Sequence, residues 1–266
     1  MEDDFLMKDL LIVIPLGVST PGTPNLNLLK HCVWSLKEQK TNYQFDVIFA
    51  CDNNVSDDVK EYLNSTGYKI SWYDPYYFFR RGSIWKKIIQ EWQNNDSEFV
   101  AFCHYDDMWS DNKIQSQLDM MKKEDLELSW SRVNIINENN QIVSGDMASR
   151  TVLNQDTIRK GQSYAFSHSS ILKKDKFLSS GILDYLEKSA PVYEGLHYIF
   201  CHKLKGRKDD NSVFYHRVHG LSVSNNLHTE TPEISKIREI AEYSLADVKS
   251  DEKELNMEEI IRKVFP

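Results

Sequence analysis

"LLIVIPL", residues 10–16, is a short continuous apolar run. Because it shows no alternation of polar and apolar residues, it is typical of a strand that is covered on both faces of a parallel sheet. "FDVIFACDNN" (45–54) repeats the pattern and ends in Asp52 followed by two asparagines, which are common turn residues. "YKISWYD" (68–74) and "EFVAFC" (98–103) are further strand-like segments. Four strands are therefore expected in the first 110 residues.

Helix-like segments at residues 26–39, 56–64 and 82–95 separate these strands. This alternation of strand and helix predicts an α/β fold with a largely parallel sheet. Ligands of such folds bind at the carboxyl ends of the strands. The ends of the first, second and fourth strands should therefore cluster around a ligand, with Asp52 and Asp106 facing one crevice.

The second half of the chain is more mixed. Residues 126–145 have the pattern of two strands joined by an Asn-rich turn, and residues 163–174 are a strand leading to a helix near 174–188. A helix ending at Gly206 is expected over 192–206, followed by a strand in 212–224. Residues 229–266 carry ten acidic and six basic residues and predict an acidic amphipathic helical tail. This tail could pack on its own domain, or contact a second copy of the chain or another partner.

The composition fits one large domain, or one domain with an appendage. The chain has 266 residues, of which 41% are hydrophobic and 12% aromatic, enough for a substantial core. Its net charge of −8 argues against an extended nucleic-acid surface, so no nucleic-acid partner is expected. The four cysteines are far apart and form no Cys-x-x-Cys pair, which is typical of reduced thiols in a cytoplasmic protein.

The N-terminal stretch "MEDDFLMKDLLIVIPLG" (1–17) lacks the basic start and the small-residue cleavage site of a secretory signal. No run approaches the roughly 20 apolar residues of a membrane helix. A cytoplasmic location is therefore expected, and peripheral contact with a membrane is left open.

Two adjacent carboxylates, Asp106 and Asp107, follow the fourth strand. In an ordinary loop such a pair faces water. At the carboxyl end of a parallel strand, however, paired carboxylates can hold a hard divalent cation such as Mg²⁺ or Mn²⁺. The position of the pair therefore makes it a candidate metal site.

Taken in order along residues 8–225, these segments resemble the family 2 glycosyltransferases of the GT-A fold. "LIVIPLGVSTPGTPNLNLLKHCVWSLKEQ" (11–39) is similar to the opening strand, nucleotide-binding loop and first helix of the family. "FDVIFACDNNVSDD" (45–58) resembles a motif that usually reads Asp-Asp-Gly-Ser, of which Asp52 is kept. "RRGSIWKKI" (80–88) is similar to the segment that brings a basic residue to the nucleotide, here Arg81 or Lys86.

Later segments carry the resemblance further. "FVAFCHYDDMW" (99–109) matches the metal-binding segment, usually Asp-x-Asp followed by Asp, with His104 in the first place. "VYEGLHYIFCHKLKG" (192–206) matches the helix that usually opens with Glu-Asp, and it keeps Glu194 but has Gly195 in the second place. "YHRVHGLSVSNN" (215–226) resembles the closing strand and loop, where a histidine commonly approaches the metal or the diphosphate.

The resemblance implies a glycosyltransferase of the hexosyltransferase type (EC 2.4) in polysaccharide biosynthesis. It would use a nucleotide-sugar donor, a UDP-sugar, and a glycan or lipid-linked glycan acceptor. It also implies a GT-A domain over 1–228, with a nucleotide-binding half (about 1–109) and an acceptor half (about 110–228), followed by the tail at 229–266. A divalent metal, Mn²⁺ or Mg²⁺, would neutralise the leaving diphosphate. The resemblance implies that Asp106 and His219 bind the metal and that Glu194 is the catalytic base of an inverting reaction. The implied acceptor contacts are Asp107, Trp109 and His168. The implied donor contacts are Pro15, Gly17, Asp52, Arg81, Lys86, His104 and Asp106.

Other interpretations remain open for single residues. Asp52 could serve only as a turn residue, Glu194 only as a helix N-terminal acid, and His219 and Trp109 only as packed side chains. His104 could ligate a metal, contact the ribose, or fill a site that has lost its ion.

A nucleotidyltransferase is another interpretation of the whole chain. Such an enzyme should carry a basic residue in the loop after the first strand, and the absence of one in "GVSTPGTPN" (17–25) argues against it. The alternative function is a non-catalytic carbohydrate- or nucleotide-binding module of the same fold. His104 and Gly195 favour that alternative, whereas the retention of Asp106, Glu194 and His219 argues for the enzyme.

Overall fold

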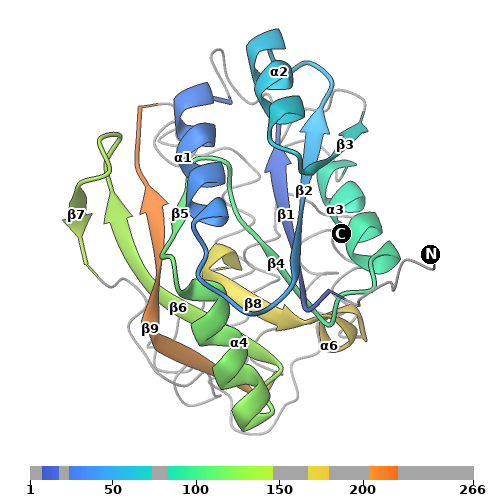
Figure 1. Ribbon diagram of the computed structural model, residues 1–266, viewed down its shortest axis with the longest axis vertical. Helices are drawn as coiled ribbons and strands as arrows, with labels where there is room; N and C mark the ends of the chain where they lie inside the picture. Colours follow the sequence, from blue (N-terminus) through green and yellow to red (C-terminus); the bar gives the residue numbers. More distant parts are fainter. Residues whose placement is uncertain (1–7, 18–23, 74–82, 146–166, 180–203, 221–266) are drawn as a thin grey trace, which may run out of the picture.

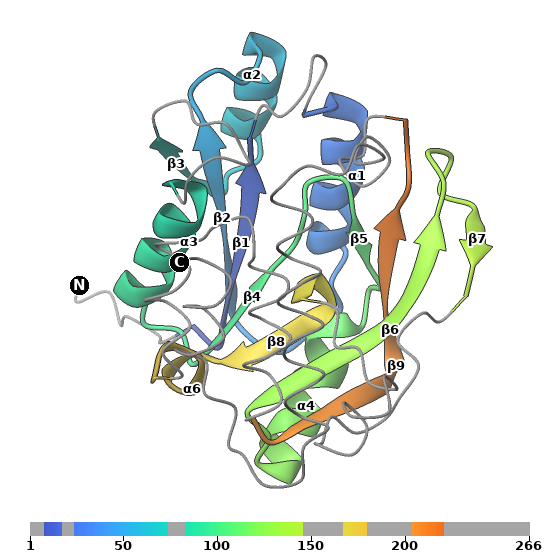
Figure 2. The same cartoon turned by 180° about the vertical axis from the view of Figure 1, so that it is seen from behind.

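The computed structural model describes residues 8–17, 24–73, 83–145, 167–179 and 204–220, which form one sheet with helices on both of its faces (Figures 1 and 2). The sheet has nine strands in the order β3-β2-β1-β4-β8-β6-β9-β5, with β7 paired to β6. The strands are β1 (Leu10–Leu16), β2 (Phe45–Asp52), β3 (Lys69–Tyr73), β4 (Phe99–Phe102), β5 (Met108–Trp109), β6 (Leu128–Ile136), β7 (Ile142–Ser144), β8 (Ser170–Lys173) and β9 (Gly206–Arg217). The helices are α1 (Leu26–Lys37), α2 (Asp57–Ser65), α3 (Ser83–Asn94), α4 (Lys113–Glu124), α6 (Lys174–Ser179) and a short 3-10 helix, η1 (Ser167–Ser169).

The first four strands are parallel and confirm the predicted α/β half. In the order β3-β2-β1-β4, Val13 of β1 lies opposite Ile48 of β2 on one side and Phe102 of β4 on the other. All seven residues of β1 are buried, as the unbroken apolar run predicted. The carboxyl ends of β1, β2 and β4 are therefore neighbours at one edge of the sheet.

The remaining strands make the sheet mixed and set the position of the candidate site. β8 is antiparallel to β4 and to β6, and β9 runs parallel to β6 from Leu128↔Gly206 to Ile136↔Arg217. β5 pairs antiparallel with β9 through Met108↔Tyr215. Because β5 follows β4 after only a short turn, this pairing places the exit of β4 beside the end of β9.

Three predicted boundaries in the second half were wrong. The strand expected over 163–174 begins only at Ser170, directly after η1. Gly206 does not end a helix but begins β9, and the strand spans 206–217 rather than 212–224. The polar stretch at 207–211 has little strand character of its own, but its pairing with β6 buries Lys208 and Asp209. The described part of α6 ends at Ser179, and the rest of the expected helix over 174–188, together with 192–203, lies outside the described residues.

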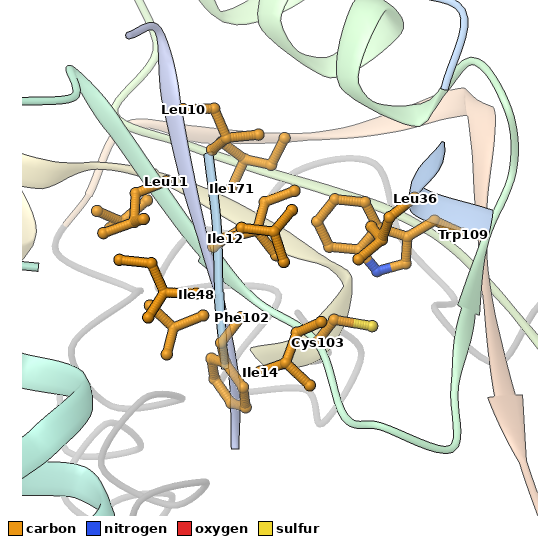
Figure 3. Close-up of a cluster of buried hydrophobic side chains, with 14 of the residues drawn as sticks. Leu10, Leu11, Ile12, Ile14, Leu36, Ile48, Phe102, Cys103, Trp109 and Ile171 are labelled. Carbon is orange, nitrogen blue, oxygen red and sulfur yellow. The ribbon is translucent and has the colours of Figure 1, made fainter. Parts of the chain in front are cut away.

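The hydrophobic core lies between the sheet and its helices (Figure 3). On one face, Leu36 of α1 and Trp109 of β5 belong to the core together with Ile12 and Cys103. On the other face, Phe177 of α6 packs edge-on against Trp92 of α3, with ring centroids 5.0 Å apart.

Cys32, Cys51 and Cys103 are free and buried, as the wide cysteine spacing predicted, and Cys201 lies outside the described residues. Among the helices of the described ranges, none is long and apolar enough to span a bilayer.

Candidate donor and metal site

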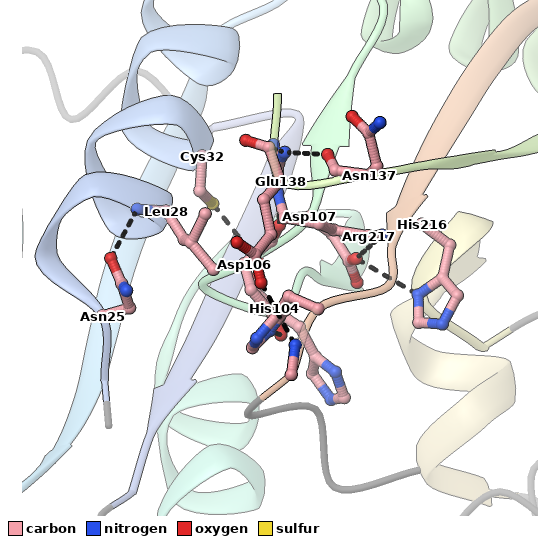
Figure 4. Close-up of polar contacts among 12 residues, drawn as sticks. Asn25, Leu28, Cys32, His104, Asp106, Asp107, Asn137, Glu138, His216 and Arg217 are labelled. Carbon is pink, nitrogen blue, oxygen red and sulfur yellow. Dashed lines mark hydrogen bonds and ion pairs between the residues drawn. The ribbon is translucent and has the colours of Figure 1, made fainter. Parts of the chain in front are cut away.

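The chain turns sharply between β4 and β5, and the two aspartates of this turn point to different partners (Figure 4). The turn is closed by a hydrogen bond from the Asp107 N–H to the His104 carbonyl, at 3.2 Å. Asp106 is partly exposed, whereas Asp107 is fully buried. The adjacent carboxylates therefore do not share one environment.

Asp106 faces His219, which follows the end of β9. The distance from Asp106 Oδ2 to His219 Nε2 is 2.9 Å, and the His219 side chain is buried. Burial raises the pKa of Asp106, but the hydrogen bond from His219 and the charges of His104 and His219 outweigh it, so that the pKa lies below its usual value. Asp106 is therefore held as a carboxylate at the carboxyl edge of the sheet, and the two predicted metal ligands lie in contact.

The carboxylate of Asp107 is hydrogen-bonded to β9. Its Oδ1 accepts hydrogen bonds from the Arg217 N–H at 2.8 Å and from His216 Nδ1 at 3.2 Å. The Arg217 guanidinium also fixes the turn, because its Nε donates to the Asp106 carbonyl at 2.7 Å and its Nη1 to the Asn137 carbonyl at 2.8 Å. Sequence reasoning missed Arg217, although a basic residue in a strand-like segment two positions before His219 was a usable signal.

These contacts correct the interpretation of Asp107 as an acceptor contact. The side chain has no exposed surface, and one of its oxygens holds the backbone of β9. Trp109 fits the packing alternative: it is buried in the core, and the ammonium group of Lys113 lies 4.5 Å from the centroid of its ring. Neither side chain offers a surface to a sugar.

His104 and His168 form a third group beside the turn. Their ring centroids are 3.7 Å apart, and His168, buried in η1, packs edge-on against Phe102 of β4 at 4.6 Å. His104, Asp107 and His168 each offer one potential metal-ligand atom, and these atoms lie within 4.8 Å of one another. The expected acceptor residue His168 is therefore a neighbour of the turn, although it is largely shielded from solvent.

The predicted donor residues of the first two strands lie at the same edge of the sheet. Pro15 pairs with Ala50, one residue before the register pair Leu16↔Cys51, so the end of β1 lies beside Asp52. Asp52 is buried, and its Oδ1 accepts a hydrogen bond from the Asn54 N–H at 2.7 Å, which is the geometry of a turn-forming aspartate. The hydroxyl of Tyr73 donates to the Leu16 carbonyl at 3.0 Å and closes this end of the sheet.

Several predicted site residues cannot be placed. Arg81, Glu194 and Gly195 lie outside the described residues, as does the tail at 229–266, and Lys86 lies in α3 with its side chain outside the description. Gly17 directly follows β1 and is buried. The roles of these residues, and the division of the chain at 109 and 228, stay predictions.

Comparison with known proteins gives the same fold. The family described as "Glycosyl transferase family 2" matches residues 25–178. The chain is also similar to solved structures of Staphylococcus aureus TarS 1–349. The structure in complex with UDP-GlcNAc has a TM-score of 0.63 at 13% identity, covering 96% of this chain and 71% of that one. The complex with UDP has a TM-score of 0.60 at 13% identity, covering 96% and 70%. At these identities the likeness shows the fold alone, and among curated proteins none matches the chain.

Proposed function

This chain belongs to glycosyl transferase family 2, and on that basis we propose that it transfers a sugar from a UDP-sugar to a hydroxyl group of a glycan or lipid-linked glycan acceptor. The observation that carries the proposal is the contact between Asp106 and His219, which joins the exit of β4 to the end of β9. This carboxylate and imidazole lie at the sheet edge where ligands of α/β folds bind. The solved TarS complexes contain UDP and UDP-GlcNAc, which makes UDP the first nucleotide to test.

The donor set of this pair fits a divalent cation. Asp106 Oδ2 and His219 Nε2 are 2.9 Å apart. Two ligands about 2.1 Å from one ion, at right angles to each other, are about 3.0 Å apart. A carboxylate oxygen with an imidazole nitrogen suits Mn²⁺, and Mg²⁺ is the second candidate. The bound ion would neutralise the charge that develops on the leaving diphosphate.

The other residues would orient the substrates. The lowered pKa of Asp106 keeps it ionised at neutral pH, and Arg217 holds the turn that carries it. Asp52, Pro15 and Gly17 are placed at the ends of the first two strands, from which they could contact the nucleotide. We assign the basic contact to Arg81 or Lys86.

We assign the catalytic base to Glu194, which would remove the proton of the acceptor hydroxyl and give inversion at the anomeric carbon. Transfer of this type would serve polysaccharide biosynthesis in the cytoplasm.

One observation favours a second function, a binding module without catalysis. His104 stands where the family usually has a carboxylate, and its ring lies against that of His168, with the centroids 3.7 Å apart and the planes tilted by 40°. A binding module would bind UDP and UDP-sugars but would neither hydrolyse nor transfer the sugar. Release of UDP from UDP-GlcNAc by the wild type, lost in Glu194→Gln, would favour the enzyme.

Calorimetric titration of UDP with and without Mn²⁺ tests the proposed donor site. We expect Mn²⁺ to strengthen UDP binding to the wild type and to have no effect on Asp106→Ala. Asp46→Ala is the matched control, because Asp46 lies near the amino end of β2, at the opposite edge of the same sheet. Binding that is independent of Mn²⁺, or equal in all three proteins, would contradict the assignment of Asp106 and His219.

A further inference from the structure

A second group of metal-binding residue types lies in and beside the turn that carries Asp106. His104 and Asp107 come from the turn after β4, and His168 comes from η1, far away in the sequence. One potential ligand atom of each lies within 4.8 Å of the others. We propose that these three residues form a second cation site, separate from the Asp106–His219 pair, that takes a transition-metal ion of the Zn²⁺ type.

The carboxylate of Asp107 gives the strongest support. The residue has no exposed surface, and its Oδ1 is held by the Arg217 N–H and by His216 Nδ1. Its Oδ2 is also buried and accepts no hydrogen bond from any residue in the described parts of the chain. A buried carboxylate oxygen without a partner is unfavourable, and a cation bound at Oδ2 would remove that penalty. The bonds to Oδ1 would then orient the ligand, as second-shell contacts do in metal sites.

The two histidines are held in position by their surroundings. Phe102 packs against His168 with the ring centroids 4.6 Å apart, and the Ser169 carbonyl accepts a hydrogen bond from Lys113 Nζ at 2.8 Å. This bond ties η1 to the start of α4, so the backbone that carries His168 is anchored. The backbone of His104 is held by the turn hydrogen bond from the Asp107 N–H to the His104 carbonyl. Rotation of the two imidazole rings is therefore the main movement that binding requires.

The distances between the three potential ligand atoms allow them to bind one ion after a small movement. Ligand atoms at 2.0–2.2 Å from one ion are about 3–4 Å apart. In this structure the three potential ligand atoms lie within 4.8 Å of one another, so they need to approach only slightly. Two imidazoles and one carboxylate are the protein ligands of many catalytic and transition-metal sites and suit Zn²⁺ rather than Mg²⁺. The ion would join the exit of β4 to η1 and, through Asp107, to β9. This inference does not depend on the proposed transfer reaction.

Titration of Co²⁺ into the full chain, after its metals have been removed with a chelator, tests the proposal through the visible absorption of the ion. We expect Co²⁺ absorption that Zn²⁺ abolishes by competition, and the band of the second site should persist in Asp106→Ala, which removes a ligand of the first site. Loss of a direct ligand in His168→Gln should weaken Co²⁺ binding by about 100-fold or more, since even outer-shell changes reduce metal affinity by about 10–100-fold. Absence of the band in the wild type, or its loss in Asp106→Ala but not in His168→Gln, would overturn the proposal.

Folding of the variants is a separate question, because His168 is buried. Circular dichroism would show whether His168→Gln folds, and His104→Gln, at a partly exposed position, is the second variant. X-ray absorption of the Zn²⁺-loaded wild type needs no variant. Two coordinated imidazoles are expected for the proposed site, whereas a single imidazole would assign the ion to Asp106 and His219 and overturn the proposal.

Discussion

The buried ammonium group of Lys113 gives a prediction whose size follows from the structure. It lies at the start of α4 without exposed surface, donates to the Ser169 carbonyl at 2.8 Å and also contacts the Gln117 side chain. Burial lowers the pKa of Lys113 from 10.5 to about 7, against the opposing effects of Asp209 and Cys103. Between these two pKa values the unfolded chain holds a proton that the folded chain has released. The free energy of unfolding must therefore rise with pH in this window.

The size of this increase in the free energy of unfolding follows for a change from pH 7 to pH 9. One proton per molecule over two pH units corresponds to about 2.7 kcal/mol. Because folded Lys113 is still about half protonated at pH 7, the contribution of this group should be about 2 kcal/mol. Lys113→Met removes the titrating group, so the variant should lose that part of the pH dependence whatever its absolute stability.

Urea unfolding of the wild type, Lys113→Met and Lys123→Met at both pH values measures the effect. Lys123 is exposed on the same helix and serves as the matched control. Titrating groups that do not interact with Lys113, such as the Cys51 thiol, whose pKa burial raises, are common to the three proteins and cancel in the comparison. From pH 7 to pH 9, the free energy of unfolding of the wild type and of Lys123→Met should each increase by about 2 kcal/mol more than that of Lys113→Met. An equal pH dependence in all three proteins would refute the reasoning.

Two further predictions concern the fold and use urea unfolding with a matched control. Gly206→Ala should destabilise by about 1–3 kcal/mol through overpacking, because an added Cβ would lie 3.0 Å from Leu128 Cδ2 and 3.2 Å from its Cβ and Cγ. Gly145→Ala, where nothing lies within 4 Å, should change stability by less than about 0.5 kcal/mol, and equal effects at the two glycines would contradict the packing argument. Asn25→Ala should cost about 1 kcal/mol, because the Asn25 side chain accepts hydrogen bonds from two N–H groups of the first turn of α1. Ser56→Ala should cost less, since the Ser56 side chain makes no such bond to α2, and a larger effect at Ser56 would contradict this assignment.

The parallel half of the fold was predictable because local and global signals agree there. The apolar runs of β1, β2 and β4 are buried as their patterns require, and the predicted helices begin and end within two residues of α1, α2 and α3. The N-terminal part of β9 was not predictable in this way. Lys208 and Asp209 become strand residues only through pairing with β6, and tertiary pairing overrides their weak strand propensity.

The candidate site was predicted only in part, for a related reason. The position of Asp106 after a buried strand indicated a ligand-binding edge, and His219 was found through the resemblance. That Asp107 turns inward could not be inferred, because both aspartates follow the same strand and nothing local distinguishes them. Arg217 and His216 bond to Asp107 only because β5 pairs with β9. The two-residue strand β5 is too short to give a sequence signal.

The pairing of β5 with β9 therefore determines the use of both aspartates. With Met108 opposite Tyr215, the Arg217 N–H reaches Asp107 and the His219 ring reaches Asp106. A shift of this register by one residue would turn every side chain of β9 to the opposite face of the sheet and separate both pairs. Because the hydrogen bonds of buried Asp107 hold that register, they also hold His219 beside Asp106. The adjacent carboxylates thus divide two tasks: Asp107 holds β9 in place from within the core, and Asp106 faces the edge where the proposed donor would bind.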